Sequence, residues 1–96
     1  TSRYALSIKI DFLFLKTIEH TYSAGYANIN RKLNFVILAS KKLDQLKLFL
    51  QIAWEIKALD DKRYIALSQK LNEIGRMIGH WQKNLTKLPN NSGEKR

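Results

Sequence analysis

The sequence predicts an all-α protein, an up-down antiparallel helical bundle of the four-helix-bundle type in which three long helices are visible. Three observations predict this class. Apolar residues recur at steps of three and four over three long stretches, which is the period of an amphipathic helix. The single proline of the 96-residue chain is at position 89, so no earlier residue lacks the N–H that a helix interior needs. The connections between the stretches are short, which makes neighbouring helices antiparallel.

The first helix is predicted from about residue 2 to residue 22. It carries two apolar rows at helical spacing. One row holds Ala5, Ile8, Phe12, Leu15 and Tyr22, and the other holds Leu6, Ile10, Leu13 and Ile18. We expect Gly25 to end the helix in a left-handed cap, since glycine takes that conformation without steric cost. Asn28 or Asn30 then serves as the N-cap of the next helix.

The second helix is predicted to run to about residue 59 and would be about 45 Å long. One row resembles a coiled-coil seam, with heptad-spaced Ile29, Val36, Leu43 and Leu50 and interleaved Ala39, Leu46 and Ala53. A second row beside it holds Phe35, Leu38, Phe49, Ile52, Ile56 and Leu59. Lys32 and Lys57 take seam positions at the two ends of this helix, where their stems can reach solvent.

The third helix is predicted to begin at Asp60 and Asp61, whose carboxylates suit a helix N-terminus. Its apolar row is unbroken and holds Tyr64, Leu67, Leu71, Ile74, Ile78, Trp81 and Leu85. We therefore expect a helical bundle domain over residues 1–88. Residues 89–96 have no large apolar side chain and are expected to form a disordered basic tail.

The predicted apolar surface is too wide for three helices. Ile37, Leu48 and Trp54 fall outside both rows of the second helix. We expect part of this surface to meet another helix or another subunit, and the bundle to assemble into a homo-oligomer.

The charge of the chain restricts its function classes. Lys and Arg number 17 against 8 Asp and Glu, giving a net charge of +9. Such an excess attracts polyanions, so nucleic acid and an anionic membrane surface are both candidates, beside a charge that serves solubility alone. No segment has the roughly 20 apolar residues of a membrane span, so we predict a soluble, cytoplasmic protein without a membrane partner.

The sequence offers no catalytic machinery. Cysteine is absent, which excludes disulfides and thiolate chemistry. His20 and His80 lack the spacing of metal ligands, and Ser68 has no partner that would activate it. No glycine-rich phosphate loop follows a strand. We expect no enzyme activity, no cofactor and no metal.

The basic residues of the last two helices are the candidate nucleic-acid-binding groups. On the third helix, Lys62, Gln69, Arg76 and Lys83 recur every seven residues on the side away from the apolar row, with Arg63 and Lys70 adjacent. The second helix adds Arg31, Lys41, Lys42 and Lys47. Cations at such a repeat can follow a phosphate backbone, with affinity gained by counterion release. The alternative interpretation is an ordinary solvated helix face.

Gly75, Gly79 and Trp81 are the candidate helix-packing residues. Each glycine costs the helix about 0.5–1 kcal/mol relative to alanine, so we predict close approach by a packed helix; a ligand against bare backbone is the alternative. Trp81 lies on the apolar row and is expected in the core. Trp54 is the better candidate for an exposed aromatic, at a subunit contact or stacked on an unpaired base.

Two runs carry a family resemblance. They are Ala58-Leu59-Asp60-Asp61-Lys62-Arg63-Tyr64-Ile65 and Leu71-Asn72-Glu73-Ile74-Gly75-Arg76-Met77-Ile78-Gly79-His80-Trp81. The chain resembles the accessory variability determinant (Avd) proteins of diversity-generating retroelements, over about residues 3–85. More weakly, it resembles the four-helix-bundle proteins encoded in intervening sequences of bacterial 23S ribosomal RNA genes. Members of both groups are short four-helix bundles, and the resemblance implies a homopentamer that forms a basic barrel.

The resemblance implies a bacterial or phage-encoded accessory subunit. Its partners would be RNA or DNA and the reverse transcriptase of the retroelement, whose mutagenic retrohoming it would support. Lys47 falls where the family usually has Arg, and Arg76 matches a family Arg. The second resemblance implies the alternative, a structural or protein-interaction bundle whose basic face binds an acidic partner.

Three features depart from the Avd pattern. Gln51 stands where a second basic residue is common, and His80 replaces a small residue. The family's first helix has no counterpart before Thr1. We therefore expect a fragment, a processed form or a variant whose fourth helix comes from elsewhere.

Overall fold

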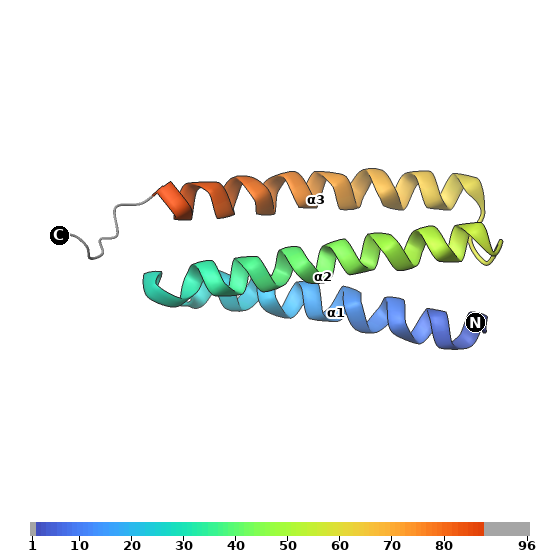
Figure 1. Cartoon of the computed structure of the whole chain (residues 1–96), viewed down its shortest axis with the longest axis horizontal. Coiled ribbons are helices and arrows are strands. Elements are labelled where there is room, and N and C mark those ends of the chain that lie inside the picture. Colours follow the sequence, from blue (N-terminus) through green and yellow to red (C-terminus); the bar gives the residue numbers. More distant parts are fainter. Residues whose placement is uncertain (1, 88–96) are drawn as a thin grey trace.

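The computed structural model describes residues 2–87, and these form three long helices. They are α1 (Arg3–Tyr26), α2 (Ile29–Glu55) and α3 (Asp61–Lys87), which run up, down and up along one axis (Figure 1). Helix is the one regular secondary structure of these residues, which confirms the all-α class. The predicted tail at residues 89–96 lies outside the described residues.

The turn between α1 and α2 differs from the predicted one. α1 begins at an N-cap, Ser2, whose hydroxyl oxygen accepts the backbone N–H of Ala5 at 3.0 Å. The helix continues through Gly25, where we had expected a left-handed cap, and stops at Ala27, which is extended at φ −74° and ψ 153°. The predicted cap was wrong because an extended residue ends this helix, so no left-handed position is needed. Asn28 caps α2 as predicted, accepting the N–H of Arg31 at 3.2 Å.

α2 ends at Glu55, four residues before the predicted end. Lys57 takes φ 64°, and it is the one non-glycine residue with positive φ among residues 2–87. Its N–H bonds to the carbonyl of Trp54 at 3.0 Å, and the N–H of Ala58 bonds to that of Ala53 at 2.8 Å. These bonds form a Schellman motif, in which a lysine occupies the position that glycine usually takes.

The corner between α2 and α3 is held by side chains at the predicted helix start. Asp60 caps α3, because its carboxylate accepts the N–H of Arg63 at 2.8 Å. The indole N–H of Trp54 donates to the carboxylate of Asp61 at 2.6 Å. The Trp54 ring also stacks on Tyr64, with centroids 4.8 Å apart and planes 9° from parallel.

The core is built around the predicted seam of α2. The six seam residues from Val36 onward are buried: Val36, Ala39, Leu43, Leu46, Leu50 and Ala53. Leu6 and Leu13 of α1 and Leu71 and Ile78 of α3 are also buried. Ile29, which we had placed in the same seam, is 56% exposed because it is the first residue of α2, at the end of the bundle.

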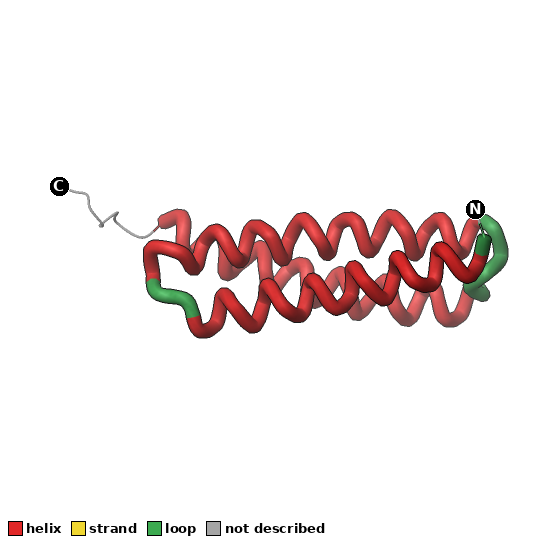
Figure 2. The backbone as a smooth tube through the Cα atoms, turned by 90° about the horizontal axis from the view of Figure 1, so that it is seen from below, coloured by secondary structure: helices red, strands yellow, loops and turns green. Residues whose placement is uncertain are grey.

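The helices are not arranged as a closed bundle. α2 packs against both α1 and α3, whereas the backbones of α1 and α3 do not come close to each other (Figures 1 and 2). Large apolar side chains therefore stay exposed on all three helices, half of them on α1. None of the helices in residues 2–87 combines the length and apolar character of a membrane span.

Candidate nucleic-acid interface

The heptad-spaced row of α3 lies on its solvent side. Lys62, Gln69, Arg76 and Lys83 are all exposed. Successive members are about 10.5 Å apart along the axis. A seven-residue repeat drifts by about 20° per step around a straight helix, so the row winds by about 60° from Lys62 to Lys83. The result is a gently curved line along the outer side of the rod, with cations at three of its four positions and the neutral Gln69 at the other.

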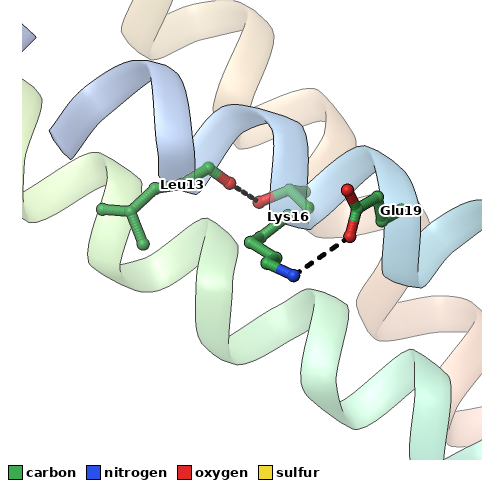
Figure 3. A network of polar contacts seen from close by, with 4 residues as sticks. Leu13, Lys16 and Glu19 are labelled. Atoms are coloured by element: carbon green, nitrogen blue, oxygen red, sulfur yellow. Dashed lines mark hydrogen bonds and ion pairs between the residues drawn. The ribbon is translucent and has the colours of Figure 1, made fainter. Parts of the chain in front are cut away.

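The cations of this row have no acidic partner within residues 2–87. The two ion pairs of that part of the chain join Lys16 to Glu19 at 3.2 Å, drawn in Figure 3, and Arg63 to Asp60 at 3.7 Å. Because Arg63 and Asp60 are both largely exposed, water screens their attraction and it contributes little. The charges of Lys62, Arg76 and Lys83 are thus available to an external anion.

Lys47 lies at the contact between α2 and α3. It is half-buried, and its ammonium is next to Gly75: a Cβ added there would be 3.1 Å from Lys47 Nζ and 3.4 Å from Leu43 Cδ2. Lys47 therefore meets α3 at Gly75, the residue that precedes Arg76 in the sequence. The close approach that we predicted for the two glycines is present at Gly75, where a lysine side chain makes it. At Gly79 the prediction was wrong, because no atom of another helix in the described residues lies within 4 Å of the position that a Cβ would take.

The remaining basic residues of α2 point in other directions. Lys42 is half-buried and lies seven residues before Phe49, so both are on one side of the helix. That side faces α1, since the ammonium of Lys9 lies 5.7 Å from the Phe49 ring centroid. Lys41 is exposed. Arg31 is exposed in the first turn, with its guanidinium 5.5 Å from the Phe35 ring centroid.

Arg63 and Lys70 are exposed on a different side of α3 from the heptad row. Lys70 is four residues before Ile74, which lines an apolar groove between α1 and α3. The nine predicted basic residues therefore do not share one surface. The structure brings Lys62, Arg76 and Lys83 into one line and places Lys47 where α2 meets α3. Arg31, Lys41, Lys42, Arg63 and Lys70 lie elsewhere.

Trp81 is half-buried and packs against the core, as expected for the apolar row of α3. Lys32, whose side chain we had expected to extend to solvent, instead reaches Trp81. The Lys32 ammonium lies 5.7 Å from the Trp81 ring centroid and donates to the carbonyl of Ala24 at 2.7 Å. The position of Lys32 just after the turn could have indicated this contact, because a lysine there can reach the last carbonyls of α1.

The arrangement can hold an anion by charge. Within the described range, no three His, Cys, Asp or Glu side chains gather where they could bind a metal ion.

Models of known families, curated proteins and solved structures gave no match to the chain. The resemblance carried by residues 58–65 and 71–81 thus stays a prediction.

Proposed function

We propose that this protein is a non-enzymatic accessory subunit that binds nucleic acid and the reverse transcriptase of a diversity-generating retroelement. In this role it supports mutagenic retrohoming, and the polymerase performs the chemistry. The protein supplies a basic surface that holds RNA or DNA by the phosphate backbone.

One observation carries the proposal. Lys62, Arg76 and Lys83 are exposed, share one side of α3 and have no acidic partner among residues 2–87. The row is about 31 Å long, similar to about nine base pairs of a duplex. Phosphate contacts of this kind give affinity without reading sequence, so the row suits a subunit that follows a template of any sequence.

The choice of partner rests on the resemblance. The runs at residues 58–65 and 71–81 are similar to the Avd pattern, and Arg76 falls on a basic position of that pattern. The same helix thus carries both the resemblance and the line of free cations. Its reverse transcriptase partner follows from the resemblance alone.

Salt-dependent binding tests the nucleic-acid part. Binding of structured RNA, single-stranded DNA and duplex DNA is measured across a salt series for the full chain and for the double variant Arg76→Gln, Lys83→Gln. Each phosphate contact contributes about 0.9 to the slope of log affinity against log salt for a duplex and about 0.7 for a single strand. Loss of two contacts should lower the slope by about 1.8 or about 1.4, respectively.

The matched control is Lys9→Gln, Lys16→Gln, which removes the same charge from α1. It should leave the slope unchanged. Equal losses in both variants would show that net charge alone is responsible. Absence of binding at low salt by well-folded protein would contradict the proposal and favour the alternative, a bundle whose basic face binds an acidic protein. Co-purification with the reverse transcriptase tests the second partner separately.

A further inference from the structure

α1 carries an exposed apolar surface with a cationic border. Ile8, Phe12 and Leu15 are between 48% and 57% exposed, and their steps of four and three make them neighbours on one side of the helix. The ammoniums of Lys9 and Lys16 each lie 5.7 Å from the centroid of the Phe12 ring. We call these five residues the α1 face.

α2 adds a third cation to this border. Lys9 Nζ lies 5.7 Å from the centroid of the Phe49 ring as well, which fixes the register of the two helices. Lys16 is seven residues further along α1. Because α2 is antiparallel, Lys42 is displaced from Phe49 by the same length in the same direction. The half-buried Lys42 is therefore level with Lys16, and three lysines border the apolar surface.

The charges of this border are not balanced within the described chain. Glu19 pairs with Lys16 at 3.2 Å (Figure 3), whereas Lys9 and Lys42 have no acidic partner among residues 2–87. An apolar centre with aromatic side chains and a polar rim is the usual anatomy of a protein interface. A molecule that covers the α1 face must therefore bring apolar groups for its centre and carboxylates for its border.

We propose that the α1 face binds an amphipathic segment of the reverse transcriptase, one in which apolar side chains are flanked by carboxylates. This inference rests on the proposed function, which supplies the identity of the partner. Phe12 is the anchor of the contact, because an aromatic side chain buries a large area when a partner covers it. Lys9 and Lys42 pair with the flanking carboxylates and set the position of the segment.

Charge disfavours contact between the α1 faces of two copies of the chain. Such a contact would bring together Lys9 and Lys16 of each copy, and like charges across an interface oppose binding. α1 has two carboxylates to offer in return, Asp11 and Glu19, and Glu19 is already paired with Lys16. A more acidic partner therefore fits the α1 face better than the same face of a second copy.

The α1 face is separate from the two other exposed surfaces of the rod. α2 lies between α1 and α3 (Figure 1), so nucleic acid on the outer row of α3 does not cover it. Phe14, which lines the apolar groove between α1 and α3, is two residues from Phe12 and thus about 160° away around the helix. A helix that fills the groove therefore leaves the α1 face open. Template and polymerase can be held at the same time.

Calorimetric binding of the purified, nuclease-treated reverse transcriptase to the full chain tests the α1 face. Phe12→Asp removes the anchor and repels the carboxylates of the partner, so the dissociation constant should rise about 10-fold or more. Lys9→Glu, Lys16→Glu reverses the charge of the border and should have an effect of similar size. Both variants change exposed positions, and circular dichroism should show that their helicity is retained.

Each variant has a matched control. Leu48→Asp matches Phe12→Asp, because Leu48 is 52% exposed and Phe12 is 48% exposed. Lys62→Glu, Lys83→Glu makes the same charge change on the outer row of α3. Both controls should leave the dissociation constant for the reverse transcriptase unchanged, and the α3 variant should lose nucleic-acid binding instead.

The outcomes distinguish this inference from the proposed function. Equal binding by all variants would overturn the role of the α1 face and leave the accessory role intact. Absence of binding by the unchanged chain would overturn both the α1 face and the reverse transcriptase as partner. A smaller mass of Phe12→Asp in sedimentation would assign the face to a second copy, and weaker nucleic-acid binding by this variant would assign it to nucleic acid. Either result would also overturn the proposal.

Discussion

The ammonium of Lys32, on α2, donates a 2.7 Å hydrogen bond to the carbonyl oxygen of Ala24, in the last turn of α1. The same ammonium lies 3.5 Å from the carbonyl oxygen of Gly25 and 5.7 Å from the Trp81 ring centroid on α3. One half-buried cation therefore ties all three helices together at one end of the rod. It also neutralises carbonyls at a helix C-terminus, where a positive charge is favourable.

Lys32→Met should lower the free energy of unfolding by about 1–2 kcal/mol. Methionine keeps the apolar stem, so the loss comes from the charged hydrogen bond and from the helix terminus. Urea unfolding followed by circular dichroism measures it. Lys41→Met, at an exposed position of the same helix, should change the free energy by no more than about 0.5 kcal/mol. Equal effects of the two substitutions would show that the contact of Lys32 is not stabilising.

Lys57→Gly should stabilise the protein. Lys57 has φ 64°, a conformation that costs a residue with a Cβ about 1–2 kcal/mol and glycine almost nothing. The flexibility of glycine in the unfolded chain offsets part of this gain, so we expect about 0.5–1 kcal/mol. Thermal unfolding provides the measurement. In the middle of α2, Lys41→Gly should have the opposite sign and cost about 1 kcal/mol. A loss of stability at both positions would contradict the role of the left-handed turn.

Gly79→Ala and Gly75→Ala should differ in their effect on the free energy of unfolding. Alanine is favoured over glycine in a helix by about 0.5–1 kcal/mol, and position 79 has room for a Cβ, so the full gain is expected there. At position 75 the Cβ must displace Lys47 Nζ and contact Leu43, so the gain should be smaller. Adding Lys47→Ala should restore the gain at position 75 alone. Denaturant midpoints of the single and double variants measure this coupling, and its absence would place Lys47 away from Gly75 in solution.

The helical spacing of apolar residues predicted the three helices but could not decide which side of α1 is buried. Both apolar rows of α1 have helical spacing, yet Phe12 and Leu15 are exposed while Leu6 and Leu13 are in the core. Which of the two rows is buried depends on how the surface of α2 fits against α1, and the sequence of α1 alone does not contain that information. Thr17 is buried although it is polar, because its hydroxyl donates to the carbonyl of Leu13 at 2.8 Å. The α2 seam was predictable because its heptad repeat is apolar on one side.

The candidate interface was predictable only within one helix. The spacing of Lys62, Arg76 and Lys83 shows that they share a side of α3, and they do. Lys42 and Lys47 are five residues apart, about 140° around a helix, so spacing does place them on different sides of α2. Spacing cannot show how α2 turns relative to α3, so it does not tell which of the two lysines faces α3. The same holds for the contact of Lys47 with Gly75, which depends on how closely the two helices approach.

The backbones of α1 and α3 do not pack closely on each other, and this has a kinetic consequence. The close helix–helix packing in residues 2–87 joins helices that follow each other in the chain, across connections at residues 27–28 and 56–60. Contacts that are near in sequence need little loop closure, so the chain should fold in microseconds to milliseconds. Either helical hairpin can form first, because neither needs the other as a template.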